Sequence, residues 1–516
     1  MLLSLSGCAV GDKDLERWER TQQGPRKLYA VATHEKYGEE LRLHALESII
    51  KMPARSGKNI ALPVLIEGFH DDADDQDKPG ALSALTDSTR KVMIEKLTPF
   101  LEDEMKKAPP QKKADGTKDR DPTVPVKDAA FAILANEPPL VTNEAIRTRL
   151  KQAIVNWVVA DFDARLDAPQ KYSVEQMFKA IGNPAVVGLP PLIREESSKV
   201  DRITALVSDL GDPETKLKSA NQLVTLAKGI DSPQWIQKKT AEVKETNEKQ
   251  GRKDVPEAAL QNQLKAYQDQ ELFKIFSAMK KIAQKPVIDY LTGVAANKAA
   301  SEDRRKNALA ALEGHVDKTN TDLLNKLSEI AADDSTPDGV RDLAFARLGE
   351  LPKDQVVPRM YKLFDAKKWK VRWIAGSLVL KSITTKGLPE FFAHLPRGGA
   401  MGMTEFFTYG GAIQTMDSGP GEPKTRDAIL PYLNGKEGTP KLVALGYFYK
   451  GKKADSGLVE AQGGAKEPAP KCAKEDDCGW SCDIPKEGKP AESESKDIVT
   501  VGDFAKYCVL PSMNSK

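Results

Sequence analysis

One pattern of side chains recurs along the chain and limits what it can fold into. A basic residue is followed by alanine three positions later and by an apolar residue four positions after that. The spacing i, i+3, i+7 places the three side chains on one face of an α-helix, so each copy predicts an amphipathic helix. The basic positions of the six copies are Arg42, Lys127, Arg305, Arg341, Arg372 and Lys441.

A second helix is predicted before several of these copies. Residues 323–330 precede the Arg341 copy and residues 356–364 precede the Arg372 copy, each followed by a turn that contains aspartate. The unit of helix, turn and a second helix that opens with Val-Arg-x-x-Ala resembles HEAT and HEAT-like repeats. The resemblance implies an all-α fold, an α-solenoid of stacked antiparallel helix pairs, over residues 9–450.

The basic residues of the repeats have two interpretations. Arg341 and Arg372 follow turns that contain Asp334 and Asp365, and ion pairs with these aspartates would fix the stacking of the repeats. The alternative is that the arginines bind a ligand. The pattern favours the stacking role, which we extend to all six basic residues.

Several segments depart from the repeat pattern. Residues 109–125 are charged and contain proline, which predicts an exposed loop, and residues 237–258 predict a solvated helix pair or an insertion. Glycines at 398, 399, 402, 410 and 411 predict interruptions of helices. Residues 451–470 have the Gly, Ala, Lys and Pro content of a linker. Residues 471–516 form a cysteine-rich tail that is too short for a core of its own.

The first eight residues contain a sequence typical of export. Leu5-Ser6-Gly7-Cys8 resembles the lipobox of bacterial lipoproteins, in which the cysteine thiol receives a diacylglycerol and becomes the first mature residue. The resemblance implies lipidation of Cys8, with residues 1–8 as the remnant of a signal peptide. The seven residues before Cys8 carry no positive charge, so we expect the natural start upstream of Met1. The alternative is a cytosolic protein with an incidental thiol.

The remaining cysteines lie near the C-terminus. Their even number suits two disulfides once Cys8 is set aside for lipid. A four-thiolate zinc site is the alternative, because one pair is separated by three residues, although the other spacings fit zinc poorly. Disulfides are favoured, they agree with export to an oxidising compartment, and three pairings remain open. The four residues are Cys472, Cys478, Cys482 and Cys508.

Motifs for catalysis and for cofactor or metal binding are absent from the sequence. There is no phosphate-binding loop, no Gly-x-Ser-x-Gly elbow and no His-Glu-x-x-His helix. The acidic run at 71–77 lacks the glycine and the glutamate of a calcium loop. We therefore predict no catalytic residue, no cofactor and no resident metal. The five histidines are interpreted as surface or packing residues and are His34, His44, His70, His315 and His394.

The distribution of charge and hydropathy excludes two further classes of function. The chain has 77 basic and 75 acidic residues, a net charge of +2, and no long basic block. Binding to nucleic acid requires a concentrated basic surface, so we predict none. No run of about 18 apolar residues occurs, so no transmembrane helix is predicted.

A stacked array without catalytic motifs exposes a long surface that suits a protein or peptide partner. We expect a lipid-anchored protein of the bacterial envelope that acts as a non-catalytic interaction scaffold. The outer membrane is slightly favoured because Ala9, rather than aspartate, follows Cys8. Two alternatives stay open. HEAT-like repeats also occur in bilin lyases, and the array could act purely as an envelope spacer.

Overall fold

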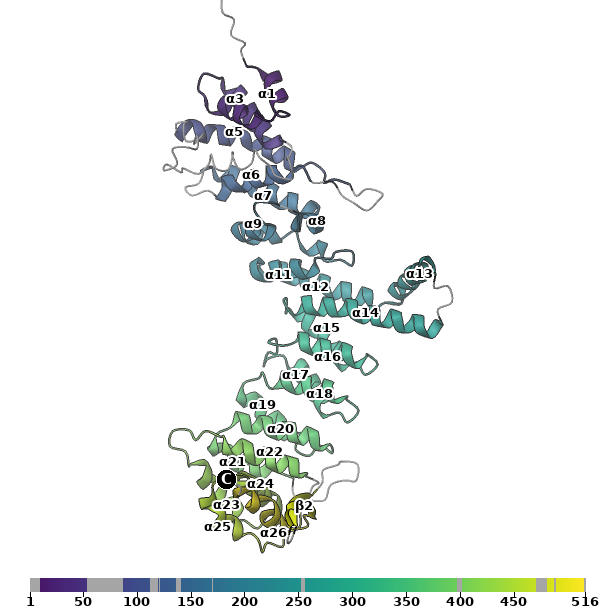
Figure 1. Cartoon of the computed structure of the whole chain (residues 1–516), viewed down its shortest axis with the longest axis vertical. Helices are drawn as coiled ribbons and strands as arrows, with labels where there is room; N and C mark the ends of the chain where they lie inside the picture. Colours follow the sequence, from purple (N-terminus) through teal and green to yellow (C-terminus); the bar gives the residue numbers. More distant parts are fainter. Residues whose placement is uncertain are drawn as a thin grey trace, which may run out of the picture. The chain divides into compact units, whose positions relative to one another are not determined.

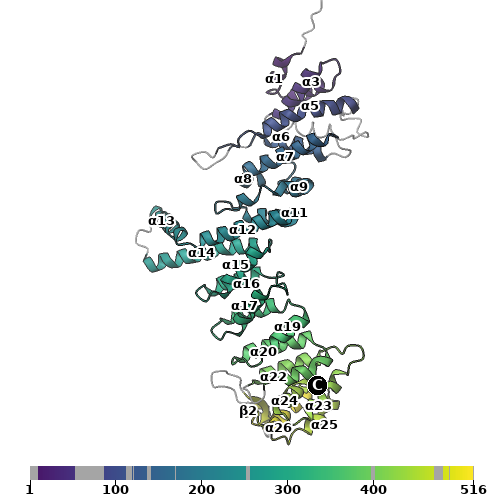
Figure 2. The same cartoon turned by 180° about the vertical axis from the view of Figure 1, so that it is seen from behind.

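The structure is a computed structural model that divides into two compact units, residues 1–286 and 287–516. It describes residues 10–52, 87–111, 119, 121–135, 141–168, 170–251, 256–396, 401–469, 480–486 and 489–514. Each unit is built mainly from packed helices (Figures 1 and 2). The fold is an α-solenoid with a small C-terminal tail, as the repeats predicted.

Unit 1 is a stack of helices in which neighbours along the chain pack together. The pair α2 and α3 is followed by α5, which packs on both α6 and α7, and later by α11 and α12, which both pack on α14. The bounds are α1 (Asp12–Trp18), α2 (Gly24–Thr33), α3 (Glu39–Lys51), α5 (Asp87–Met105), α6 (Val124–Ala135), α7 (Glu144–Ala160), α8 (Phe162–Leu166), α9 (Val174–Ile181), α10 (Asn183–Val186), η1 (Pro190–Leu192), α11 (Val200–Leu210), α12 (Pro213–Ile230), α13 (Pro233–Lys249) and α14 (Glu257–Met279).

Unit 2 continues with helix pairs and ends in the tail. Within it α17 packs on α18, α19 on α20, and α22 on α24. The helices are α15 (Lys285–Ala296), α16 (Glu302–Ala311), α17 (Thr321–Ala332), α18 (Asp338–Leu348), α19 (Lys353–Tyr361), α20 (Trp369–Ser382), η2 (Thr385–Gly387), α21 (Leu388–His394), α22 (Met403–Gln414), α23 (Thr425–Leu433), α24 (Gly438–Phe448), η3 (Lys453–Asp455), α25 (Ser456–Glu460), α26 (Val501–Asp503), η4 (Phe504–Val509) and α27 (Leu510–Asn514).

Side-chain caps define where many of these helices begin. The oxygen of each capping residue accepts a hydrogen bond from a backbone N–H of the first turn, which would otherwise have no partner in the helix. Proline follows two of the caps, at the position where its missing N–H costs nothing. The capping residues are Asn143, Ser173, Asp212, Ser232, Ser301, Asn320 and Thr500.

The repeated face identified in the sequence is the buried face of its helices. The central alanine of every copy is 0% exposed, at Ala45, Ala130, Ala308, Ala344, Ala375 and Ala444. The apolar residue four positions on is also buried in five copies, and Leu134 is half-buried. A small side chain at the centre of the face allows a neighbouring helix to approach closely, which explains the recurrence of alanine.

The predicted helix interruption at 410 and 411 is wrong, because α22 runs through both glycines from Met403 to Gln414. Gly410 lies where α22 crosses α24. A Cβ atom at this position would lie 2.0 Å from the carbonyl carbon of Gly446. The glycine therefore serves close helix packing rather than chain reversal.

The tail contains a feature that the sequence did not predict, a β-hairpin. Strands β1 (Ser481–Lys486) and β2 (Lys489–Asp497) pair antiparallel, with Cys482 opposite Lys496. The segment 451–470, expected to be a linker, includes η3 and α25 and buries Val459 completely. Trp480 lies 5.2 Å from Phe406 of α22, measured between ring centroids, so the tail uses the solenoid as its core.

Candidate functional site

Three repeat arginines in unit 2 share one structural role. Each lies on the second helix of a pair and reaches back to backbone carbonyls at the end of the first helix or in the turn between them. Arg305 Nε donates to the carbonyl of Ala295 at 2.8 Å, and Arg372 Nη1 donates to the carbonyls of Ala366 and Lys367 at 2.6 and 2.8 Å. The last carbonyls of a helix have no partner within it, so these arginines satisfy groups that the helix leaves open.

Arg341 shows this role most completely. Its Nη2 donates to the carbonyls of Asp333 and Thr336 at 3.0 and 2.9 Å, and its Nη1 pairs with the Asp338 carboxylate at 2.6 Å. The ionic partner is therefore Asp338, in the first turn of the same helix, and not the turn residue Asp334 proposed from the sequence. Asp338 Oδ2 also accepts a 2.5 Å hydrogen bond from Nζ of Lys370 in α20. This hydrogen bond lowers the pKa of the Asp338 carboxyl.

Arg372 adds a contact to the following helix. Its Nε lies 3.4 Å from Oε1 of Glu405, the first-turn glutamate of α22, which is completely buried. Its carbonyl oxygen accepts a 2.7 Å hydrogen bond from the hydroxyl of Tyr409. The ion pair thus joins α20 to α22, whereas the sequence suggested a pair with the turn aspartate Asp365.

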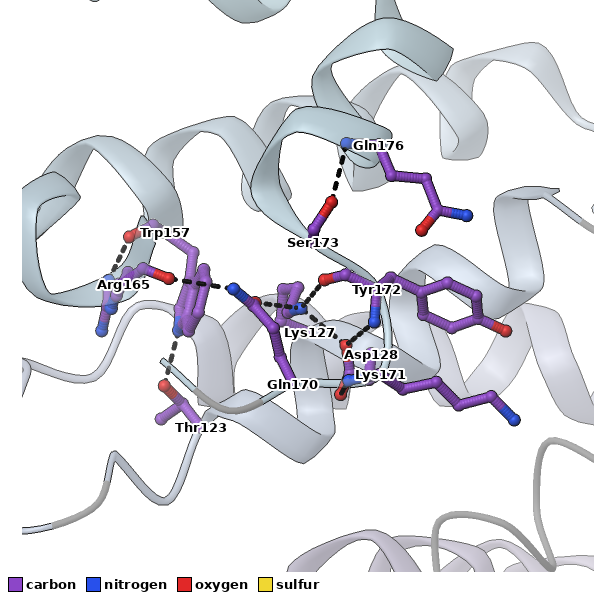
Figure 3. A network of polar contacts seen from close by, with 10 residues as sticks. All are labelled: Thr123, Lys127, Asp128, Trp157, Arg165, Gln170, Lys171, Tyr172, Ser173 and Gln176. Atoms are coloured by element: carbon purple, nitrogen blue, oxygen red, sulfur yellow. Dashed lines mark hydrogen bonds and ion pairs between the residues drawn. The ribbon is translucent and has the colours of Figure 1, made fainter. Parts of the chain in front are cut away.

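The basic residue of the second repeat copy lies in a buried polar network in unit 1 (Figure 3). Lys127 is 0% exposed, and its Nζ contacts Asp128 at 2.6 Å, Oε1 of Gln170 at 2.7 Å and the carbonyl of Tyr172 at 2.9 Å. Burial lowers the pKa of Lys127, while the Asp128 carboxylate acts in the opposite direction. Asp128 also accepts from the backbone N–H of Lys171 at 3.0 Å, so the pair holds α6 against the segment that leads into α9.

The same network contains a residue that the sequence analysis missed, Arg165 of α8. It is 1% exposed, donates to the carbonyl of Trp157 at the end of α7, and pairs with Asp121 at 2.9 Å. Its guanidinium carbon lies 4.2 Å from the centroid of the Trp157 ring, a cation–π distance. Arg165 thus satisfies the end of the preceding helix as the repeat arginines do. Ala168 follows it at the same spacing as in the repeats, but it lies in the bend after α8 and not on a helix.

The two remaining repeat residues contact other elements. Arg42 Nη2 lies 3.0 Å from the sulfur of Met93 and joins α3 to α5. Lys441 pairs with Glu467 at 2.7 Å and ties α24 to the segment that precedes the tail. All six repeat residues are buried, which favours a packing role over binding of a ligand from solvent.

The most prominent exposed element of unit 1 is the hairpin of α13 and α14. Figures 1 and 2 show α13 and the N-terminal part of α14 projecting away from α11 and α12. We call this hairpin the arm. It contains residues 237–251 and 256–258, the described part of the segment that was predicted as a solvated helix pair or an insertion. At its base Gln268 donates to the carbonyl of Ile230 at 2.8 Å, and Lys239 pairs with Glu195 at 3.1 Å.

The two helices of the arm form an open pocket of about 500 Å³. Its walls combine amides and a hydroxyl with a short apolar strip and charges of both signs. The ring of Tyr267 stacks on Trp235 at 5.8 Å, and the Lys239 ammonium lies 5.7 Å from both ring centroids. The lining residues are Lys239, Glu242, Val243, Thr246, Asn247, Gln250, Gln263, Ala266, Tyr267 and Gln270.

One of the two predicted disulfides lies among the described residues. Cys482 of β1 and Cys508 of η4 form a disulfide. Because Cys482 and Cys508 form this disulfide, they are not available as thiolate ligands of a four-cysteine zinc site. Cys472 and Cys478 lie outside the described residues, as does Cys8 with its predicted lipid.

The described part of the chain offers no group of three or more His, Cys, Asp or Glu that could hold a metal ion. His70 and the acidic run at 71–77 fall outside it. No helix within the described ranges is long and apolar enough to cross a membrane. Nothing in these residues favours the bilin-lyase alternative.

Comparison with known proteins gives matches among solved structures alone. No model of a protein family matches the chain, and no curated protein matches its sequence. Among solved structures the chain is similar to Kap121p, with 13% sequence identity and a TM-score of 0.22. The alignment covers 84% of this chain and 40% of that one, so the chain spans less than half of its structural neighbour.

Proposed function

We propose that this chain is a non-catalytic scaffold that binds another protein through the arm. The observation that carries the proposal is the pocket between α13 and α14, in a hairpin that projects from the helices of unit 1 (Figure 1). A helix hairpin that leaves the stack gives up the burial that stabilises the other pairs. A bound partner would cover the groove and recover part of that burial.

The walls of the pocket indicate what kind of partner fits. Val243, Ala266 and Tyr267 provide an apolar strip, flanked by side-chain amides that both donate and accept hydrogen bonds. Lys239 and Glu242 pair with each other at 2.7 Å, so the wall carries no excess charge there. An amphipathic helix or an extended peptide meets these requirements, whereas a highly charged ligand does not.

The proposal includes attachment of the scaffold to the bacterial envelope through a lipid on Cys8, with the outer membrane favoured. The Cys482–Cys508 disulfide supports export, because disulfides persist in oxidising compartments. The intact mass of the native protein extracted from membranes tests this part. A chain that begins at an acylated Cys8 is the expected result, and an unmodified thiol at this position would refute the anchor.

Site-specific photo-crosslinking tests the arm. A photoreactive residue replaces Gln263, which lines the pocket, and in a matched variant it replaces Lys244, which is exposed on α13 and does not line it. We expect a discrete adduct from position 263 and none from 244. Excess untagged protein should compete the adduct away, and excess Gln270→Trp protein, whose pocket is filled, should not. Equal adducts from both positions, or equal competition, would refute the proposal.

A further inference from the structure

The β-hairpin of the tail has one strand with an open edge. Among the described residues the sheet consists of β1 and β2 alone, and η4 packs on β1. The outer edge of β2 has no neighbouring strand in this part of the chain, and residues 493–497 of β2 are all exposed. An open edge carries a row of unpaired backbone N–H and C=O groups, and such a row can pair with a strand of another chain.

The pairing of β1 with β2 decides which backbone groups of β2 point outward. In an antiparallel pair, residues that exchange hydrogen bonds with the partner strand alternate with residues that do not. Ile498 donates its N–H to the carbonyl of Trp480 at 2.8 Å, and Pro485, which has no N–H, lies opposite Ser493. Both observations place the odd-numbered residues of β2 at positions that do not bond to β1. The backbone groups that face the open edge are therefore those of residues 493, 495 and 497.

The charges of β2 suit pairing with a second copy of the same strand. When two identical strands pair antiparallel about a two-fold axis at one residue, the residues before and after it lie opposite each other. An axis at Ser495 places Glu494 of each copy opposite Lys496 of the other. Both side chains are exposed, and the Lys496 ammonium lies 5.5 Å from the centroid of the Tyr507 ring. In such a dimer these are non-hydrogen-bonded positions, where opposite Cα atoms are only about 4.5 Å apart and unlike charges attract.

The two other outward-facing positions give no such match. Ser493 has glutamate on both sides in the sequence, so an axis there would oppose like charges. An axis at Asp497 would place two carboxylates opposite each other, and Lys496 opposite the buried Ile498. Charge therefore selects the axis at Ser495. In that register every outward-facing N–H and C=O of residues 493, 495 and 497 finds a partner on the other copy.

We propose that β2 pairs with β2 of a second copy of this chain, antiparallel and about a two-fold axis at Ser495, so that one sheet runs through the dimer. A second copy is the occupant because the strand itself supplies both charges in the required order. The interface is small and polar, so the dimer is weak and reversible. The inference goes beyond the proposed function and does not depend on it, since the arm belongs to unit 1.

Sedimentation equilibrium of the full chain over a range of concentrations tests the dimer. We expect the mass to rise toward that of two chains as the concentration increases. Glu494→Lys and Lys496→Glu should each raise the dimer Kd at least about fivefold, because both cross-strand pairs then oppose like charges. An equimolar mixture of these two variants should form a heterodimer with about the affinity of the unaltered chain, since unlike charges again face each other at both pairs.

Two further variants test the backbone pairing and the effect of net charge. Ser495→Pro removes the outward N–H at the axis but no hydrogen bond to β1, and it should abolish the dimer, whereas Ser495→Thr keeps this N–H and should keep the dimer. Glu460→Lys, at an exposed position of α25, makes the same change of net charge as Glu494→Lys and should leave the Kd unchanged. A chain that stays monomeric up to about 1 mM overturns the proposal. So does a dimer that withstands Ser495→Pro, or one that Glu460→Lys weakens as much as Glu494→Lys.

Discussion

A Cβ atom placed on Gly410 of α22 would lie 2.0 Å from the carbonyl carbon of Gly446 in α24. The two helices therefore cross with their backbones in direct contact. The reciprocal relation also holds, because a Cβ on Gly446 would lie 2.3 Å from the carbonyl oxygen of Phe406. This crossing supports the part of unit 2 on which the tail packs.

Gly410→Ala should therefore destabilise unit 2 by about 1–3 kcal/mol, the usual cost of overpacking a rigid contact. The neighbouring Gly411 is the matched control, since a Cβ there meets nothing within 4 Å. Gly411→Ala should stabilise the helix by about 0.5–1 kcal/mol through the lower flexibility of the unfolded chain. Urea unfolding of the two variants measures both effects, and equal behaviour would contradict the close crossing.

Arg341→Met should lower the free energy of unfolding by about 1–3 kcal/mol, because it leaves the carbonyls of Asp333 and Thr336 without their donor. Asp338 is half exposed and keeps Lys370, so it adds little to this loss. Lys370→Met removes the other cation on Asp338, but its side chain is 46% exposed. The loss should then stay below about 1 kcal/mol. Comparable losses in the two variants would mean that Arg341 does not hold the turn.

The periodicity of the sequence predicted the buried faces of single helices, because such a face depends only on residues within one helix. The spacing of Arg341, Ala344 and Leu348 specifies one face of one helix, and the structure buries all three. Arg165 occupies an equivalent position at the end of α7, but its partner Asp121 is far away in the sequence and no pattern links them. Gly410 was misread because a helix breaker and a helix-crossing glycine look alike until the neighbouring helix is known. The strand Lys489–Asp497 is almost entirely polar and lacks the apolar alternation that predicts a half-buried strand.

Reduction of the Cys482–Cys508 disulfide should loosen the tail selectively. The bond closes a loop with a sequence separation of 26, which corresponds to about 3 kcal/mol in the chain-entropy description. Hydrogen exchange with and without reductant should show faster exchange in residues 480–513 and little change in α16 to α18. A variant with Cys482→Ser and Cys508→Ser should exchange fast in both conditions. Unchanged protection of the tail after reduction would show that packing alone holds it.

Asp333 should give unit 2 a specific acid dependence. The hydrogen bond from Lys298, together with those from the backbone and hydroxyl of Ser335, lowers the pKa of Asp333. Because the folded value lies below the ordinary value of about 3.9, the stabilisation is complete above about pH 4 and disappears as the pH falls through the folded pKa. The stability difference between the unaltered chain and Asp333→Asn should therefore shrink as the pH is lowered. Asp334→Asn, at the neighbouring exposed carboxylate, is the control, and a constant difference for Asp333→Asn would contradict the assignment.

The buried pair of Lys127 and Asp128 should show strong non-additivity. Lys127→Met leaves the Asp128 carboxylate buried without a cation, and it also removes the donor to Gln170 and Tyr172, so a loss of about 3–5 kcal/mol is expected. Asp128→Asn likewise leaves the Lys127 ammonium buried without an anion, although the amide oxygen of the new side chain can still accept from the backbone N–H of Lys171. The double variant contains neither uncompensated charge. It should therefore lose less stability than the sum of the single variants, with a coupling energy of about 1–3 kcal/mol in a double-mutant cycle. Additive losses would mean that the charges of Lys127 and Asp128 do not interact. The polar network would then be held by its contacts with the backbone alone.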